Sequence, residues 1–336
     1  MTFKNKFKLL TLAAAFCGFA TPAFAQLDNA GAILRAGAAD ANILMAEYMK
    51  PFGRGFGAGL NSGWYGVAKS HKFLGFDLAI RATVAEVPMA DQSFDLADLS
   101  LTSIRPMNSA NTVTPTISGM DDPANPVMVG VYSGATLLDQ FEMPEGTGLE
   151  YVPTPMVQVG VGALFNTDIM LRYIPETEIS DIGGSISLFG IGVKHDIKQW
   201  IPVVNMLPID IMGFYGMTQL TTTAGLDVTP NVGANTNNSF AASEWENQEI
   251  SLEASGTNMG IIVGKSLPLI SVYGGIGRQT ATTDVKTTGN FPVVVPDPVA
   301  GNLTRKRIDS ISDPVNISID GANASYMLVG ARLKLL

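Results

Sequence analysis

Long segments in which apolar residues occupy every second position constrain the fold of this chain more than any other feature. The run FLGFDLAIRATVAEV places Phe76, Leu78 and Ile80 on one parity, and the C-terminal run ASYMLVGARLKLL places Arg332 and Lys334 opposite its apolar residues. A period of two residues predicts β-strands. At about 3.3 Å per residue, runs of this length can cross a bilayer as tilted strands. The chain therefore needs an apolar environment for one face of several unusually long strands.

The N-terminal stretch MTFKNKFKLLTLAAAFCGFATPAFAQ predicts a cleavable secretory signal peptide at residues 1–25. It combines a basic head, a short apolar core, and small residues before a cleavage site between Ala25 and Gln26. Cys17, the one cysteine of the chain, lies inside this segment. The mature protein is therefore expected to be exported and to use neither disulfides nor thiolate chemistry.

The composition narrows the environment in which these strands can fold. Only 15% of the residues are charged, against about 25% in typical soluble domains, and the mean hydropathy is positive at +0.22. Beyond the signal segment, no apolar run reaches the roughly 18 residues that a transmembrane helix needs. An exported, apolar chain without spanning helices fits a β-barrel in the outer membrane of a Gram-negative bacterium. The net charge of −9 argues against nucleic acid as a partner.

A soluble β-sandwich is the alternative fold, because two packed sheets can cover each other's apolar faces. Sandwich strands average only about 5–6 residues, whereas the alternating runs of this chain are much longer. We therefore predict an all-β fold, a closed antiparallel transmembrane β-barrel whose last strand pairs with its first.

The lengths of the connections predict the number of strands. Outer-membrane barrels alternate short periplasmic turns with long outer loops, and the connections at 166–168 and 265–268 are short whereas those at 221–247 and 285–322 are long. A further pair of strands inside 94–143 would bring the number to about ten, within a range of about 8–12. The other expected strands lie near 73–87, 156–165, 168–178, 184–197, 207–222, 248–264, 269–284 and 323–336.

Residues 26–66 are expected to form a helical and glycine-rich segment that plugs the barrel of residues 67–336 or caps it from the periplasm. Asp28 can cap a first helix, and Asp40 can cap a second helix that ends before Pro51. The GRGFGAG stretch that follows is expected to be a flexible passage, because it follows a helix and lacks the Lys-Ser/Thr of a phosphate loop.

Two positions break the alternating pattern. Within 248–264, Glu253 shares its parity with Met259, so we expect a bulge near 256–260 that returns Glu253 to the lumen side. Arg278 falls on the apolar parity of its strand, near the outer water boundary, where a charge costs about 0–1 kcal/mol.

Side chains on the parity opposite the apolar one are expected to line the lumen, either as ion pairs that close it or as the wall of a conducting path. The residues of this parity include both charged and apolar side chains, and a lumen wall of that kind suits a hydrophobic or amphipathic small molecule better than free water flow. The expected lumen-lining residues are Asp77, Arg81, Arg172, Asp210, Glu253, Met212 and Phe214. Membrane-interface aromatics are expected at Trp64, Tyr65, Tyr173 and Trp200, with ordinary packing as the alternative.

The residues that could carry catalysis or bind a metal are few. Ser70 adjoins His71, but neighbours on a strand face opposite sides, which disfavours a Ser–His pair. His71 and His195, the two histidines, make a weak metal site without further ligands. The acidic positions between Asp91 and Asp122 fit a solvated loop better than a Ca²⁺ site. We therefore predict neither enzymatic activity nor a metal or cofactor.

Three stretches together resemble an uncharacterised family of bacterial outer-membrane β-barrel proteins, from about residue 38 onwards: MKPFGRGFGAGLNSGWYGVAKSHKFLGFDL, PMVQVGVGALFNTDIMLRYIP and GIGVKHDIKQWIP. This family carries no activity that could be transferred. A helical segment before a long-stranded barrel is more distantly similar to the outer-membrane transporters of fatty acids and aromatic hydrocarbons, which implies an N-terminal plug. Likeness of fold alone is weak support for function.

Two functions are left open by the sequence. The first is a passive outer-membrane channel or transporter for small hydrophobic or amphipathic molecules. The alternative is a closed barrel that displays surface loops without transport. The expected partners are outer-membrane lipids, the barrel-assembly machinery and a small hydrophobic ligand.

Overall fold

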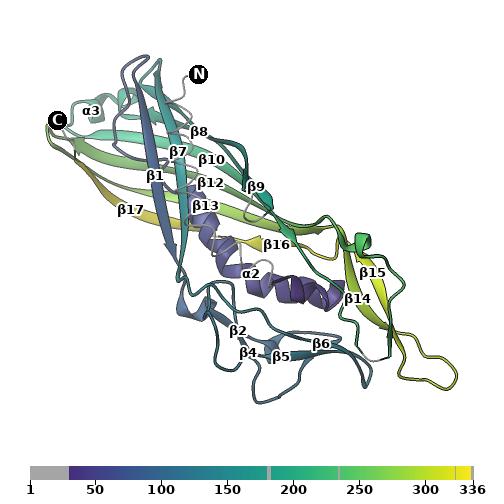
Figure 1. The fold of residues 1–336 in the computed structure, drawn as a ribbon. Coiled ribbons are helices and arrows are strands. Elements are labelled where there is room, and N and C mark those ends of the chain that lie inside the picture. The colour runs from purple at the N-terminus through teal and green to yellow at the C-terminus, as the bar shows by residue number, and fades with distance from the viewer. Residues whose placement is uncertain (1–29, 180–182, 234, 322, 334–336) are drawn as a thin grey trace.

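A long curled β-sheet with a helix lying in its curve dominates the computed structural model of this protein (Figure 1). The structure describes residues 30–179, 183–233, 235–321 and 323–333. The expected signal peptide, its cleavage site and the expected cap at Asp28 lie outside these ranges. The fold is mostly β, as predicted.

The central sheet has nine strands, and every pair of neighbours in it is antiparallel. Its order is β1-β7-β8-β9-β10-β12-β13, after which β16 and β17 pair with successive parts of β13. The long strands coincide with the alternating runs of the sequence. The bounds of the nine strands, of which β16 is short and was not expected, are β1 (Phe76–Glu86), β7 (Tyr151–Ala163), β8 (Thr167–Ile179), β9 (Gly184–Asp196), β10 (Asp210–Leu226), β12 (Gln248–Ser266), β13 (Ile270–Thr288), β16 (Asn316–Asp320) and β17 (Ala324–Leu333).

The two edges of the central sheet do not pair with each other in the described part of the chain. β1 pairs along its length with β7, and β17 pairs with β13, so each of these strands keeps one edge without a β partner. The structure is thus an open, curled half-barrel, and the closed ring stays a prediction.

Alternate residues of the central strands point into the curve or away from it, as the period of two predicts. Along β8, Met170 and Arg172 are buried, whereas Ile169 and Leu171 are exposed. The concave side therefore holds the core, and the convex side is exposed although many of its residues are apolar.

Helix α2 (Ala38–Asn61) lies along the concave side and contacts β1, β7, β10, β12, β13 and β16 (Figure 1). The prediction that it ends before Pro51 is wrong, because the helix continues through Pro51 and the following glycine-rich stretch. Most of its residues are buried, so packing against the sheet outweighs the local preference of proline and glycine against helix. Of the helices in the described ranges, none is long and apolar enough to cross a membrane.

The glycines of α2 allow the helix to approach the sheet closely. A Cβ atom on Gly55 would lie 2.5 Å from a methyl carbon of Val152, and one on Gly57 would lie 2.5 Å from the Cβ of Ala281. Both distances are shorter than side-chain contacts allow. The glycine-rich stretch is therefore a packing surface, and the prediction of a flexible passage there is wrong.

Three small sheets lie around the N-terminal half of α2 (Figure 1). Residues 94–143 contribute to two of them and do not extend the central sheet, because Val129 and Phe141 are buried in one core with α2. Their strands are β2 (Ser93–Asp95), β3 (Ile104–Pro106), β4 (Val113–Pro115), β5 (Met128–Ser133), β6 (Thr136–Glu142), β11 (Thr236–Asn237), β14 (Asn290–Pro296) and β15 (Lys306–Ser312). Short helices are η1 (Met89–Asp91), η2 (Leu96–Asp98), η4 (Lys198–Trp200), α3 (Pro202–Asn205) and η5 (Ala242–Trp245).

Asp40 connects α2 to these small sheets and does not cap the helix as predicted, since the N-cap is Gly37. Its buried carboxylate accepts hydrogen bonds of 2.7–3.0 Å from the backbone N–H groups of Thr102, Ser103 and Ile104 and from the hydroxyls of the first two. Burial raises the pKa of Asp40, but the hydrogen bonds from Ser103 and Thr102 outweigh it and hold the pKa below the ordinary 3.8. The charged carboxylate therefore stabilises this junction.

Strand β12 runs without the bulge expected at 256–260, because its pairing with β10 and β13 is continuous. Glu253 consequently lies on the convex side, 4.0 Å from Lys286, while Leu252 and Ala254 are buried on the concave side. The same alternate residues of β12 face the convex side along the whole strand, and what changes along the strand is the environment of each side. In this half of the strand the concave side meets the apolar helix and the convex side is polar.

Candidate functional site

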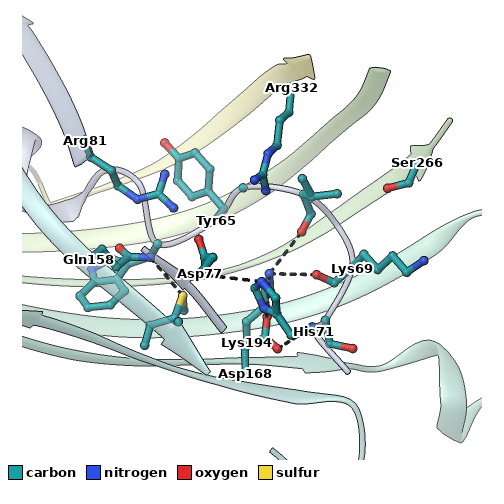
Figure 2. A pocket seen from close by; sticks show the side chains of 16 residues that line it. Tyr65, Lys69, His71, Asp77, Arg81, Gln158, Asp168, Lys194, Ser266 and Arg332 are labelled. Carbon is teal, nitrogen blue, oxygen red and sulfur yellow. Dashed lines mark hydrogen bonds and ion pairs between the residues drawn. The ribbon is translucent and has the colours of Figure 1, made fainter. Parts of the chain in front are cut away.

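A polar pocket lies at the end of the curled sheet where the connections are short (Figure 2). Its volume is about 300 Å³, and it lies between the segment that follows α2 and the ends of six central strands. The pocket therefore combines side chains from both edges of the sheet and from its middle. Its ionisable lining residues are Tyr65, Lys69, His71, Asp77, Arg81, Asp168, Lys194 and Arg332.

Asp168 is the most connected group of this pocket (Figure 2). It is the second residue of β8, after a turn in which Phe165 and Asn166 have positive φ, and its side chain is 1% exposed. Its carboxylate accepts a hydrogen bond of 2.8 Å from the backbone N–H of His71 and lies 3.1 Å from both His71 Nδ1 and Lys194 Nζ. This buried charge is thus paired on two sides, as a buried carboxylate requires.

His71 and Lys194 fix the segment that leads from α2 to β1. Lys194, which is opposite Asp168 in the β8–β9 register, also donates a 3.1 Å hydrogen bond to the carbonyl of Lys69. His71 Nε2 lies 3.5 Å from Asp77 Oδ1, so its ring lies between two carboxylates. The hydroxyl of Ser70, next in sequence, makes no hydrogen bond within the described residues, and a Ser–His pair is therefore not formed.

Arg172 is a fully buried cation that holds the C-terminal end of α2. It donates hydrogen bonds of 2.7 Å to the carbonyl of Leu60, 2.6 Å to that of Ser62 and 3.0 Å to Oε1 of Gln158. Its guanidinium carbon lies 3.7 Å from the centroid of the Trp64 ring. Carbonyls at a helix C-terminus carry partial negative charge, so they can replace the carboxylate that a buried arginine usually pairs with.

Arg81 and Arg332 face the pocket from the two edge strands, β1 and β17 respectively. Arg81 is attracted by Asp77 and, more weakly, repelled by Arg332. The Nε of Arg81 is buried and has no hydrogen-bond partner. Among the described residues, neither guanidinium forms an ion pair.

The charged residues expected in the lumen fall into three places. Asp77, Arg81 and Arg172 lie on the concave side, the first two in the pocket and the third beside it. Asp210 is half-buried at the start of β10. Glu253 is on the convex side, so its assignment to the lumen is wrong for the reason given by the continuous β12 register.

Met212 and Phe214, also expected in the lumen, are buried in an apolar cluster on the concave side that includes Trp64. Tyr65 packs against this cluster, with its ring centroid 5.5 Å from that of Phe214. Trp64 is 1% exposed. Both aromatics therefore lie inside the curve and not on an outer interface, because the chain leaving α2 turns down the interior of the sheet.

Tyr173 and Trp200, the other two aromatics expected at a membrane interface, are exposed. Tyr173 lies on the convex side of β8, and Trp200 lies in the connection after β9. The Trp200 ring stacks on His195 and donates a 2.8 Å hydrogen bond to its Nε2. Their interfacial role stays a prediction.

The described residues contain no cluster of three or more His, Cys, Asp or Glu side chains that could hold a metal ion. Within the described ranges, His195 bonds to Thr167, Gln199 and Trp200 and shares no partner with His71. In the acidic loop, Asp91 pairs with Arg54 at 3.0 Å.

The convex side of the sheet carries a continuous belt of exposed apolar side chains. Phe76 is opposite Val161, which is itself opposite Ile169 on the next strand. Towards the other edge, Ile276 is opposite Met327, which is 87% exposed. This apolar belt comprises Phe76, Leu78, Ile80, Val159, Val161, Ile169, Leu171, Tyr173, Phe189, Ile191, Val193, Tyr215, Met217, Met259, Ile261, Val263, Val272, Ile276, Met327, Val329 and Leu333.

Asp168 and Lys194 are pocket residues that the sequence alone did not predict. Both have the inward parity of their strands, and they face each other across the β8–β9 pair. Counting residues from the hairpin turn would not have matched them, because the register shifts between Ile174 and Thr177.

Fold and pocket together define a mostly β protein with a curled sheet, an enclosed helix and a charged pocket at one end. The chain belongs to the family of unknown function DUF6588, whose model matches residues 3–336. Membership of an uncharacterised family, one part of the resemblance, is thereby confirmed. No curated protein and no solved structure matches the chain.

Proposed function

We propose that this protein is an outer-membrane β-barrel that passes small hydrophobic or amphipathic molecules across the membrane. The apolar belt is the observation that carries the proposal. Soluble monomers rarely expose contiguous apolar patches larger than a few hundred Å², whereas this belt follows the strand register from β1 to β17. A bilayer supplies the apolar surroundings that the belt needs, and β-strands satisfy their backbone groups among themselves.

The height of the belt supports a membrane location. On β12 the outward side chains change from Met259, Ile261 and Val263 to polar Glu253 and Ser255. The outward residues of β1 from Phe76 to Val84 are all apolar, and at about 3.3 Å per residue this stretch is roughly 26 Å long along the strand. That length is comparable with the ~25 Å apolar band of outer-membrane barrels.

Closure of the barrel is the second element of the proposal. The free edges of β1 and β17 would leave backbone N–H and C=O groups in hydrocarbon, at several kcal/mol per group. Pairing of these edges in the membrane removes that penalty. Helix α2 then acts as a plug, and the pocket opens towards the periplasm, since short connections mark that side.

The pocket and the apolar cluster around Trp64 suit the transport of an amphipathic molecule. Arg81 and Asp77 supply charge, while Tyr65 and Met170 supply apolar surface in the same space. The pocket itself is polar, and the apolar wall that small-molecule sites also use comes from the adjoining cluster of Trp64, Met212 and Phe214. The absence of a Ser70–His71 hydrogen bond among the described contacts gives catalysis no support.

A display protein without transport is the second candidate, and the packing of α2 favours it. The helix glycines leave no room for an added methyl group against the sheet. A plug held this tightly makes the lumen impermeable unless the helix moves.

A reversible crosslink of the plug tests the two candidates. A Cβ atom on Gly53 would lie 3.3 Å from the Cβ of Ile319, close to the ~3.8 Å of a disulfide. The variant Gly53→Cys/Ile319→Cys, as mature protein in liposomes, should release an apolar dye when reduced and retain it when oxidised. Thr257→Cys/Thr280→Cys, a pair opposite each other within the sheet, is the control and should not respond. No release from the uncrosslinked protein would favour display.

A further inference from the structure

The charges that line the pocket do not balance. Lys194 pairs with Asp168, and Asp77 lies 3.5 Å from His71 and attracts Arg81 without an ion pair to it, so two carboxylates face four cationic side chains. Arg81 and Arg332 are left without an ion pair among the described residues. This cationic excess occurs in a chain whose net charge is −9. The cationic lining groups are Lys69, Arg81, Lys194 and Arg332, and the anionic ones are Asp77 and Asp168.

Arg81 contributes a donor that the described protein does not use. Its Nε is buried and has no acceptor. Buried N–H groups nearly always have a partner, because an unpaired one destabilises the fold. The geometry therefore calls for an acceptor supplied from outside the chain.

Arg332 approaches the same space from the opposite edge of the sheet. Figure 2 shows the guanidinium groups of Arg81 and Arg332 on either side of Tyr65. Arg332 repels Arg81, although Asp77 on the same strand attracts Arg81 more strongly. An oxyanion between them would reverse that repulsion, and the planar donor fork of arginine matches carboxylate and phosphate oxygens.

The surroundings of this position are apolar on one side. Tyr65 packs against Phe214 and Tyr326, with ring centroids 5.5 and 6.4 Å apart. Tyr273 and Leu328 contact the same cluster. A ligand whose charged end lies between the arginines can place an apolar body against these rings.

We propose that Arg81 and Arg332 form an oxyanion site that binds the carboxylate or phosphate head of a small amphipathic molecule. The proposal rests on the proposed transport function for the role of the ligand, but the site itself stands on the pocket. Occupancy links β1 to β17, so the ligand holds together the two edges of the sheet.

Equilibrium binding to the mature protein in a non-ionic detergent tests the site. The probes are octanoate, octyl phosphate, neutral octanol and inorganic phosphate. Octanoate and octyl phosphate should bind at least ~10-fold more tightly than octanol. Arg81→Gln and Arg332→Gln should each weaken their binding by ~10-fold or more, the loss of one charge-assisted hydrogen bond.

The matched control is Arg278→Gln, an exposed arginine on the convex side of β13, which should bind all probes like the wild type. If Arg81→Gln does not fold, Arg332→Gln gives the same information from an exposed position. Equal affinity for octanol and octanoate, or unchanged affinity in the arginine variants, would overturn the proposal. Equal affinity for inorganic phosphate and octyl phosphate would overturn the amphipathic ligand in favour of a free anion.

Failure of this site and failure of transport are distinguishable. Binding is measured without flux, so a protein that binds octanoate but releases no dye would retain the site and lose the transport function. Dye release with no preference for anionic probes in the binding measurement would retain transport and lose the site.

Discussion

Among single residues, Arg172 explains how the C-terminal end of α2 is fixed inside the curve of the sheet. Its guanidinium donates hydrogen bonds to the carbonyls of Leu60 and Ser62 at the end of the helix and stacks on the indole of Trp64. An arginine suits this place better than a lysine, because its donors form a rigid planar fork. One side chain of the sheet thereby determines where the chain leaves the helix and turns towards the pocket.

Replacement of Arg172 by methionine should lower the free energy of unfolding by about 2–5 kcal/mol, since several buried acceptors lose a charged donor at once. The matched control, Arg278→Met, removes one exposed 3.3 Å contact with Asn323 and should change it by less than about 0.5 kcal/mol. Denaturant titration of the folded protein in detergent measures both. Equal effects of the two replacements would show that Arg172 does not anchor the helix.

The Asp40 carboxylate makes the free energy of unfolding depend on pH, and the lowered pKa sets the direction of that dependence. Its pKa is lower in the folded protein than the ordinary 3.8, so its contribution is complete above that value and is lost as the pH falls through the folded pKa. Asp40→Asn should destabilise the protein by roughly 2–4 kcal/mol at neutral pH, because an amide offers the donors of 102–104 a poorer acceptor.

The difference in unfolding free energy between wild type and Asp40→Asn, measured from pH 3 to 7, should shrink below pH 3.8. Asp98→Asn, a change at the exposed last residue of η2, serves as the control and should show the same pH dependence as the wild type. A difference that stays constant down to pH 3 would exclude the proposed role of the carboxylate charge.

At the scale of elements, α2 depends on glycine where an isolated helix would disfavour it. Gly57→Ala would normally improve helix propensity by about 1 kcal/mol, but its methyl group would lie 2.5 Å from Ala281. We expect a net loss of about 1–3 kcal/mol from overpacking. Gly53→Ala makes the same chemical change, but its nearest contact is 3.1 Å from Ile319 Cγ2. A shift of a few tenths of an ångström relieves that contact, and the gain in helix propensity offsets its cost, so the change should be nearly neutral.

Thermal unfolding of the two alanine variants compares these effects directly. A melting temperature that falls for Gly57→Ala and hardly moves for Gly53→Ala agrees with a helix pressed against the sheet. A rise for Gly57→Ala would mean that the helix lies further from β13 than the structure places it.

The elements also show what a sequence of this kind can predict. The long strands were predictable, because a period of two is a local signal that needs no knowledge of neighbours. The length of α2 was not, since burial by distant strands overrode the local signals of Pro51 and the glycines. The bulge expected near 256–260 failed for a related reason: a change of surroundings along β12 imitated a change of parity.

The pocket was predictable only in part. Parity alone put Asp77 and Arg81 on the concave side, where the structure has them. The pairing of Asp168 with Lys194 depends on an irregular register, and the burial of Trp64 depends on the path of the chain after α2. Neither can be derived from spacing along the sequence.

At the scale of the whole molecule, the central sheet is divided between two environments. One half carries the apolar belt on its convex side and the pocket within its curve. The other half has polar convex residues and meets the small sheets around the N-terminal half of α2. The convex surface of the same strands is therefore apolar at one end of the sheet and polar at the other.

The measurement that tests the membrane assignment most directly is the lipid exposure of single labelled cysteines. Cys17, the one cysteine of the chain, lies in the expected signal peptide, so each introduced cysteine is unique in the mature protein. Labels at Ile191→Cys and Val329→Cys, in the apolar belt, are compared with Thr221→Cys and Glu253→Cys, outward residues of the polar half. The first two should be quenched by lipid-attached quenchers and protected from a water-soluble one, and the second two should behave the opposite way. Equal access of the water-soluble quencher to all four positions would contradict a belt immersed in lipid.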